Sequence, residues 1–316
     1  MTIARSVELA ERGRGKTYPN PLVGAVVVRD GEVVGEGLHE RRGEPHAEVN
    51  ALRAAGDRAH GATLYVSLEP CTHHGATQPC VDAILEAGVG RVVVGVRDPN
   101  PNVSGGGVER LREAGVDIEV VSGEPAWRAR DLNAGYLSVY ERGRPWVIYK
   151  AAVTLDGRMS VPGERWVSGE ESRRRVHVLR SWVDAVAVGM GTVRADEPRL
   201  DARGVDAPKQ PRRLAFGRGQ LPEGSELELR TGAPADELRA LAQEGVQTLL
   251  LEGGPTLAAS FFAADLVDKL LVFVAPKLVG DGPSLVTGLS GPLALERLHA
   301  EQVDEDVLLE AYVHDP

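Results

Sequence analysis

The chain has 316 residues, of which 46 are acidic and 36 basic, so its formal charge is −10. At about 150 residues per domain, this length predicts two domains. The acidic balance and the 4% of aromatic residues argue against binding to a nucleic-acid backbone or to single strands. Two cysteines exclude a disulfide scaffold, and we expect a cytoplasmic protein.

The first half alternates apolar runs of strand length with short amphipathic segments. The predicted helices are 3–12, 46–55, 80–87 and 108–114. The predicted strands are 23–28, 33–34, 63–67, 91–96 and 117–121. Strands that alternate with helices predict a sheet covered by helices in an α/β domain.

A polar segment with Gly and Pro, residues 141–145, predicts the domain junction. The predicted strands after it are 146–153, 184–189, 213–216, 247–251, 269–275 and 306–313, the last as an edge strand. The predicted helices are 170–180, 236–243 and one that begins near Pro255. Because the halves show no repeat, we expect two different α/β domains, 1–143 and 146–316.

Three short motifs carry metal-binding chemistry: His46-Ala47-Glu48, Pro70-Cys71 and Pro79-Cys80. One imidazole and two thiolates would hold Zn²⁺ and leave a fourth tetrahedral position for water, as catalytic zinc requires. Helix N-termini favour thiolates at Cys80 and at Cys71. Glu48 could accept a proton from zinc-bound water and pass it to a leaving amine.

Two alternatives for these motifs stay open. His73 or His74 could supply a fourth protein ligand, which would make the zinc site closed and structural. The two cysteines could also be ordinary buried apolar side chains.

The run from Ser67 to Cys80 resembles the deaminase domain of the bifunctional riboflavin-biosynthesis deaminase–reductases. The segments 18–24, 37–39 and 98–101 extend this resemblance. It implies a cytidine-deaminase-like three-layer domain with substrate contacts at Asn20, His39, Asp98 and Asn100. The chain departs from the family at Ala76, where a cation is usual. Either another cation, such as Arg41 or Arg42, meets the substrate phosphate, or the deaminase binds its substrate more weakly.

Glycines follow two apolar strands in the second half, in Gly189-Met190-Gly191-Thr192 and in Glu252-Gly253-Gly254-Pro255-Thr256. Such glycines let backbone N–H groups approach a pyrophosphate at a helix N-terminus. A tight turn without a ligand is the alternative for each.

The second half resembles the reductase domain of the same family, which is similar to dihydrofolate reductase in fold. The resemblance is carried by the segments 150–158, 166–168, 177–180, 191–196, 252–254 and 275–278. It implies NADPH contacts at Ala152, Trp166, Thr192, Asp196, Gly254, Pro255 and Thr256. The implied substrate contacts are Lys150, Glu164, Ser168, Arg180, Leu200, Arg203 and Glu252. The two arginines among them suit the phosphate monoester of the substrate, because guanidinium pairs with it bidentately. Lys150 and Asp156 are expected to hydrogen-bond the sugar or polarise its imine.

The resemblance implies two successive reactions on small pyrimidine ribose phosphates, with neither nucleic acid nor membrane as partner. Zinc-bound hydroxide would deaminate 2,5-diamino-6-ribosylamino-4(3H)-pyrimidinone 5′-phosphate. NADPH would then reduce the ribosyl side chain of 5-amino-6-(5-phosphoribosylamino)uracil to ribityl. We also expect a homo-oligomer. The alternatives are a nucleic-acid base deaminase with an unrelated C-terminal domain, a zinc-folded binding module, and a chain that keeps one of the two activities.

Overall fold

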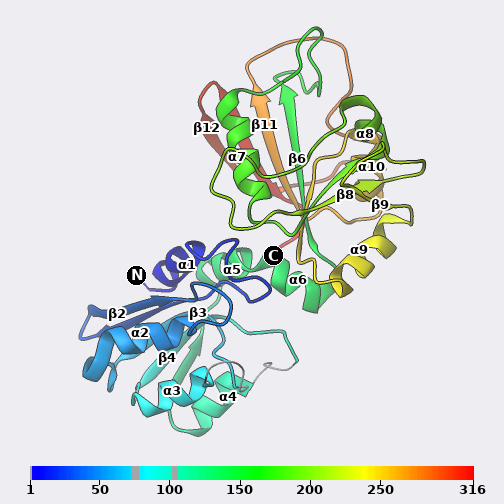
Figure 1. Cartoon of the computed structure of the whole chain (residues 1–316). Coiled ribbons are helices and arrows are strands. Elements are labelled where there is room, and N and C mark those ends of the chain that lie inside the picture. The colour runs from blue at the N-terminus through cyan, green and yellow to red at the C-terminus, as the bar shows by residue number, and fades with distance from the viewer. Residues whose placement is uncertain (1, 73–77, 102–105) are drawn as a thin grey trace. The chain divides into compact units, whose positions relative to one another are not determined.

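A computed structural model describes residues 2–72, 78–101 and 106–316. The chain forms two compact units, Met1–Arg142 together with Pro316, and Gly143–Asp315 (Figure 1). The division falls inside the predicted junction, 141–145. The last helix of the first unit extends to Arg142, so the first two residues of that junction are helical.

The first unit is built on a five-stranded sheet in the order β2-β1-β3-β4-β5. The strands are β1 (Gly24–Arg29), β2 (Glu32–Leu38), β3 (Thr63–Leu68), β4 (Arg91–Val96) and β5 (Asp117–Val120). β1 pairs antiparallel with β2 and β3, whereas β3, β4 and β5 are parallel. Runs of valine form the buried central strands, because β-branched side chains suit a strand covered on both faces.

Helices cover both faces of this sheet. They are α1 (Ile3–Glu11), α2 (Ala47–Ala55), α3 (Cys80–Glu86), α4 (Gly106–Glu113), α5 (Glu124–Leu132) and α6 (Ala134–Arg142), with a 3-10 turn at Gly56–Ala59. α1 and α5 pack on one face, and α2, α3 and α4 on the other (Figure 1). The three-layer α/β fold is therefore confirmed, although the sequence patterns predicted neither α5 nor α6.

A close approach of α2 to β2 sets the position of the helix start that carries His46 and Glu48. A Cβ at Gly37 would lie 2.3 Å from the carbonyl oxygen of Ala47 and 2.4 Å from the amide nitrogen of Ala51. Only glycine therefore lets the first turns of α2 lie directly against the strand.

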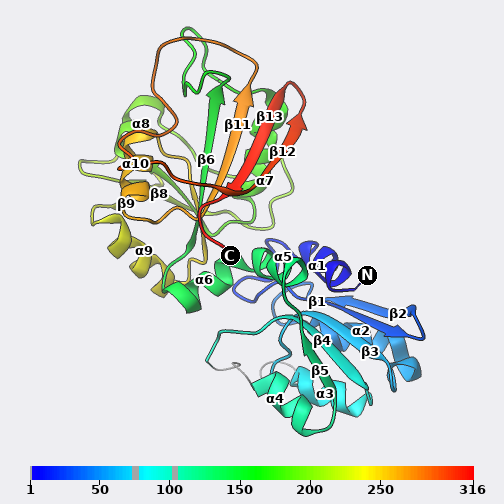
Figure 2. The ribbon, with the colours of Figure 1, turned by 180° about the vertical axis from the view of Figure 1, so that it is seen from behind.

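The second unit contains an eight-stranded sheet in the order β12-β13-β11-β6-β10-β7-β8-β9. Its strands are β6 (Trp146–Thr154), β7 (Ala185–Gly189), β8 (Arg212–Phe216), β9 (Glu228–Arg230), β10 (Thr248–Leu251), β11 (Lys269–Ala275), β12 (Glu296–Val303) and β13 (Asp306–Tyr312). The strands from β11 to β9 are parallel, whereas β13 and β12 are added antiparallel (Figure 2).

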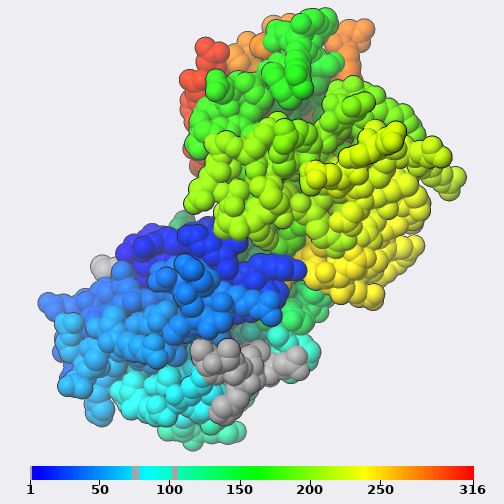
Figure 3. All heavy atoms as spheres, viewed as in Figure 1, coloured from blue at the N-terminus to red at the C-terminus, as the bar shows by residue number. Residues whose placement is uncertain are grey.

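The helices of the second unit are α7 (Glu170–Arg180), α8 (Met190–Asp196), α9 (Pro234–Gln243) and α10 (Pro255–Ala263). α8 and α10 begin directly after β7 and β10, which are neighbours in the sheet. The segment with β8, β9 and α9 forms much of the face of this unit that Figure 3 shows. Among the described residues, no helix is long and apolar enough to cross a bilayer.

The prediction that residues 306–313 form an edge strand is wrong. β12 pairs with the outer side of β13, so Glu296–Val303 is the edge of the sheet (Figure 2). Every residue of β12 except Val303 is exposed. The strand therefore lacks the apolar alternation by which a half-buried strand is recognised in a sequence.

Candidate functional site

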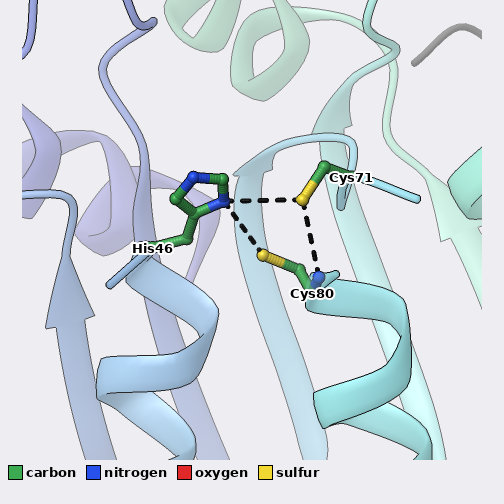
Figure 4. Close-up of side chains that lie close together, drawn as sticks. All are labelled: His46, Cys71 and Cys80. Carbon is green, nitrogen blue, oxygen red and sulfur yellow. Dashed lines mark hydrogen bonds between the residues drawn. The ribbon is translucent and has the colours of Figure 1, made fainter. Parts of the chain in front are cut away.

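Three side chains that are far apart in the sequence meet at one end of the first sheet (Figure 4). His46 caps α2, Cys71 follows β3, and Cys80 is the first residue of α3. The His46 Nδ1 atom lies 3.2 Å from Cys80 Sγ and 3.5 Å from Cys71 Sγ. Their three ligand atoms all lie within 4.8 Å of one another.

The donor set fits a zinc ion. One imidazole nitrogen and two sulfurs are ligands that zinc prefers, whereas calcium and magnesium take oxygen. His73 and His74, the alternative source of a fourth ligand, lie outside the described residues, as does Ala76. Three protein ligands from the described chain would leave one tetrahedral position for water.

The two thiols differ in acidity. The pKa of Cys71 is lowered to about 4, because the Cys80 thiol and then His46 hydrogen-bond to its sulfur. The same hydrogen bond and burial raise the pKa of Cys80. The backbone N–H of Cys80, at the start of α3, donates to the Cys71 sulfur at 3.5 Å. The helix start therefore favours a thiolate at Cys71, where the sequence had favoured Cys80 first.

Glu48 lies in the first turn of α2 and is 3% exposed. Burial, and next the charge of Cys71, raise its pKa to about 7, while the charge of His46 opposes the rise. Its Oε2 atom has no hydrogen-bond partner among the described residues. A buried carboxyl with a pKa near neutrality and one vacant oxygen is suited to accept and release a proton.

Two of the expected substrate contacts, Asn20 and His39, are joined to each other. The Asn20 amide nitrogen lies 3.1 Å from His39 Nε2, and His39 Nδ1 lies 3.3 Å from the carbonyl oxygen of Pro45. Burial lowers the pKa of His39, which favours a neutral ring that donates from Nδ1 and accepts at Nε2. The His39 ring lies edge-on to His46, with centroids 5.2 Å apart.

The other two, Asp98 and Asn100, lie just beyond β4. The Asn100 N–H donates to Asp98 Oδ1 at 2.9 Å, and Tyr136 donates to the same carboxylate. Burial raises the pKa of Asp98, while these two donors oppose the rise. The two cations that could meet a phosphate, Arg41 and Arg42, are exposed, and Arg41 pairs with Glu44 at 3.3 Å.

The second unit contains two adjoining cavities of about 800 and 530 Å³. They share part of their lining, including Trp166, Arg180 and Glu252. The larger is also lined by Lys150, Ala152, Ser168, Asp196 and Arg203, and the smaller by Thr192, Asp196, Leu200 and Arg203. The structure thus brings together ten of the fourteen residues expected to contact NADPH or substrate.

A buried ion-pair cluster joins the two cavities. Glu252 accepts from Lys150 Nζ at 3.2 Å and from Arg180 Nε and Nη2 at 2.7 and 3.0 Å. Burial alone would raise the pKa of Glu252, but the charges of Lys150 and Arg180 lower it to about 2. Arg180 therefore directs its planar fork at Glu252, where the sequence had suggested a phosphate.

The segment that follows α8 holds the cavity wall in an unusual backbone conformation. Leu200 is 3% exposed and has a φ of 54°, a region that bulky residues rarely adopt. The next residue, Asp201, accepts Arg180 Nη1 at its carbonyl and Arg203 at its carboxylate. Arg203 is exposed and lines both cavities.

Four expected contacts do not line either cavity. Gly254 caps α10, and Pro255 and Thr256 form its first turn, beside the start of α8. Glu164 is exposed and pairs with Lys277 at 2.5 Å.

The expected sugar contact at Asp156 is not supported by its surroundings. Its carboxylate accepts the Thr154 hydroxyl at 2.6 Å and the N–H of Gly280 at 2.7 Å. These donors lower its pKa to about 2. Asp156 closes a turn against a neighbouring loop, because backbone N–H groups from that loop occupy its oxygens.

Sequence reasoning missed three residues that line the larger cavity: Arg165, Arg173 and His177. The guanidinium groups of Arg165 and Arg173 lie 4.9 and 5.5 Å from the Trp166 ring centroid. Such cation–π contacts hold the indole at the mouth shared by both cavities. The signal available in the sequence was the position of Arg165 next to Trp166.

The lowered pKa of Glu252 predicts that the second unit is sensitive to acid. In the folded state the carboxylate stays ionised down to pH about 2. Its contribution to the free energy of unfolding is therefore complete above its ordinary pKa of 4.5 and is lost as the pH falls from 4.5 to about 2. We expect a loss of about 3 kcal/mol from this residue. Unfolding in guanidinium at a series of pH values measures this loss. If the free energy of unfolding of Glu252→Gln depended on pH as strongly as that of the wild type, the prediction would be contradicted.

Comparisons with known proteins match both units. The family model of the RibD C-terminal domain matches residues 145–309, and that of the cytidine and deoxycytidylate deaminase zinc-binding region matches residues 1–96. The chain is 38% identical to riboflavin biosynthesis protein RibD of Aquifex aeolicus, covering 96% of this chain and 95% of that protein. It is 39% identical to the RibD of Escherichia coli, over 94% and 92% of the two chains.

Solved structures give the same result for the fold. Acinetobacter baumannii RibD, form 1, matches with a TM-score of 0.87 and 35% identity, over 98% of this chain and 97% of that one. A deaminase/reductase from Thermotoga maritima matches with a TM-score of 0.85 and 33% identity, over the same shares. Both relatives contain the two units in one chain.

Proposed function

The chain belongs to the RibD family of bifunctional riboflavin biosynthesis enzymes, and from this premise we propose how its residues divide the two reactions. It is a zinc-dependent deaminase and an NADPH-dependent reductase. The observation that supports the assignment best is the convergence of His46, Cys71 and Cys80 beside the buried, partly unpartnered carboxyl of Glu48. By analogy with the Thermotoga maritima relative, the substrates are diaminohydroxyphosphoribosylaminopyrimidine and 5-amino-6-(5-phosphoribosylamino)uracil.

In the deaminase unit, His46, Cys71 and Cys80 would hold the zinc ion. When bound, zinc lowers the pKa of a coordinated water and so supplies a nucleophile at neutral pH. Glu48 would take the proton that this water loses and deliver it to the amino group of the pyrimidine. The C–N bond then breaks with ammonia as the leaving group, and a carbonyl replaces the amine.

Two hydrogen-bonded pairs of residues would orient the pyrimidine substrate. Asn20, with its amide fixed by His39, and Asp98, with its carboxylate fixed by Asn100, offer donors and acceptors on loops beside the metal ligands. Fixed polar groups of this kind hold a reacting ring in place at a low entropy cost.

In the reductase unit, the two adjoining cavities would hold cofactor and substrate. NADPH, when bound, supplies the hydride that reduces the sugar carbon. Trp166, Ala152, Thr192 and Asp196, with the turn 254–256 at the start of α10, would lie along the cofactor. The turn offers backbone N–H groups at a helix N-terminus, where a pyrophosphate is favoured.

The substrate would lie against Lys150 and Glu252 in the larger cavity. Their ion pair, completed by Arg180, holds a donor on the central strand β6 and an acceptor just beyond the end of β10. Ser168 lines the larger cavity, Leu200 the smaller one and Arg203 both, and Arg203 would meet the phosphate.

Removal of zinc separates the two activities. The metal ligands belong to the first unit and the cavities to the second, so a chelator is expected to abolish ammonia release and leave NADPH oxidation intact. NADPH oxidation must be measured with the deaminated pyrimidine supplied directly. Added zinc should restore ammonia release. Equal loss of both activities on chelation would contradict this division of the chain.

We propose a homo-oligomer that pairs through β12, and a cytoplasmic location. β12 is an edge strand with Leu298 68% exposed, and Leu293 and Leu295 are also exposed. A long exposed edge with apolar side chains is a template for pairing with a second copy.

The proposed cytoplasmic location rests on the zinc ligands, because the cytoplasm keeps the thiols of Cys71 and Cys80 reduced.

An edge-strand substitution tests this assembly. Leu298→Asp is expected to shift the protein to the monomer in sedimentation velocity, because a buried carboxylate opposes pairing. Leu278→Asp is the matched control, since Leu278 is 76% exposed and lies outside β12. A wild-type chain that already sediments as a monomer would contradict the proposal.

A further inference from the structure

The loop that carries Asn20 is fixed by a buried amide from the end of α5. Asn133 follows α5 and is 4% exposed. Its Oδ1 accepts the N–H of Leu22 at 2.8 Å, and its Nδ2 donates to the carbonyl of Leu22 at 2.8 Å. Both ends of one side chain therefore hold the backbone two residues beyond Asn20.

The Asp98 carboxylate is fixed by the next helix. Tyr136 on α6 is 6% exposed, and its hydroxyl lies 2.9 Å from Asp98 Oδ1 and 3.2 Å from Oδ2. Asp98 itself is 5% exposed. With the Asn100 N–H on Oδ1, the phenol sets the plane in which this carboxylate lies.

Glu69 adds a third buried contact, from the strand that leads to Cys71. Its two carboxylate oxygens accept the N–H of Asp98 at 3.1 Å and the N–H of Val108 at 3.0 Å. The backbone that carries Asp98 is thereby tied to the end of β3, while its side chain is tied to α6.

The helices that supply Asn133 and Tyr136 are closely anchored to the sheet. A Cβ at Gly95, on β4, would lie 2.8 Å from the Cβ of Ala129 on α5. Glycine thus permits α5 to lie directly on the strand that leads to Asp98. This segment follows residue 96, where the match to the deaminase zinc-binding region ends.

We propose that Tyr136 and Asn133 are positioning residues for the deaminase reaction, through which the α5–α6 segment aligns the two substrate-binding loops. The inference rests on the proposed function, in which Asn20 and Asp98 contact the pyrimidine. Packing of α6 alone would be served by a phenylalanine ring. The hydroxyl matters because a buried carboxylate that loses a donor also loses its fixed orientation.

The test is Tyr136→Phe in the full-length zinc-loaded enzyme, with Tyr140→Phe as the matched control one turn along α6. Tyr140 is 42% exposed and packs edge-on against Tyr136. We expect Tyr136→Phe to raise the KM for the diaminopyrimidinone phosphate about tenfold and to leave kcat within about twofold. Zinc content, reductase activity and the KM of Tyr140→Phe should equal those of the wild type.

A double-mutant cycle with Asp98→Ala separates alignment of the carboxylate from general loosening. Once the carboxylate is absent, Tyr136→Phe should raise KM no further, whereas additive effects would overturn the inference. If KM rises in Asp98→Ala but is unchanged in Tyr136→Phe, the inference is overturned while the substrate role of Asp98 stands. An unchanged KM in Asp98→Ala overturns the substrate role of Asp98 as well.

Asn133→Asp provides a second, independent variant. It keeps the acceptor for the Leu22 N–H and loses the donor to the Leu22 carbonyl. We expect KM to rise about threefold with kcat retained. A fall in kcat without a change in KM would overturn the role of Asn133.

Discussion

Glu48→Gln is expected to lower kcat for ammonia release by about 10²–10⁴-fold, with zinc still bound at one ion per chain. The substitution keeps the shape of the side chain and removes its ability to carry a proton between water and the leaving amine. The carboxyl is buried, has a pKa near 7 and offers an oxygen that accepts no hydrogen bond from the described residues. Ammonia release and metal analysis on the same preparation measure the effect.

Glu44→Gln provides the control for this experiment. Glu44 precedes the zinc ligand His46 by two positions and pairs with Arg41 near the surface. Its substitution should leave both kcat and zinc content unchanged. Unaltered ammonia release by a zinc-loaded Glu48→Gln enzyme would exclude the proton-carrying role.

Glu252→Gln is expected to cost about 3–5 kcal/mol of the stability of the reductase unit and to lower its kcat/KM at least about 30-fold. The substitution removes the carboxylate that neutralises Lys150 and Arg180, which are both buried. Their side chains are only 16% and 12% exposed, so water cannot replace the lost carboxylate. Denaturant unfolding and NADPH oxidation with the deaminated substrate measure the two effects.

Glu226→Gln is the matched control for the reductase. Glu226 pairs with Arg213 at the surface of the same unit, where an ion pair contributes about 0–1 kcal/mol. Its loss should change neither stability nor kcat/KM appreciably. A similar cost in the two variants would contradict the special role of the buried cluster.

The zinc ligands could be found from the sequence because few residue types bind zinc and this chain has only two cysteines. Each followed a proline, and His46 lay beside a glutamate. What the sequence could not give is the acidity of the thiols. That depends on the hydrogen bonds that the Cys80 thiol, His46 and the Cys80 N–H donate to Cys71, and these contacts form only in the folded chain.

The ion-pair cluster of the reductase shows a different limit. Lys150, Arg180 and Glu252 were each identified by resemblance, but their separations in sequence hid the contacts among them. Arg180 was expected to meet a phosphate, and the structure pairs it with Glu252. Asp156 was expected to contact the sugar, and its carboxylate accepts the nearby Thr154 hydroxyl and the N–H of Gly280, 124 positions away.

Elements that depend on tertiary context were also missed. The segment α5–α6 contains Asn133 and Tyr136, which serve loops far away in the sequence and carry no local pattern of their own. β12 forms by pairing with β13 and has no buried face to mark it. The strands β4 and β11 were predicted to the residue, because a continuous apolar run marks a strand that is buried on both faces.

Zinc K-edge X-ray absorption on the purified enzyme tests the central claim most directly. The account predicts one zinc per chain with two sulfur ligands at about 2.3 Å and two lighter ligands at about 2.0–2.1 Å, one imidazole and one water. Both sulfurs should be needed, so Cys80→Ser should lose zinc and ammonia release together. A spectrum with two imidazoles and no oxygen, or zinc retained in that variant, would contradict an open site built from His46, Cys71 and Cys80.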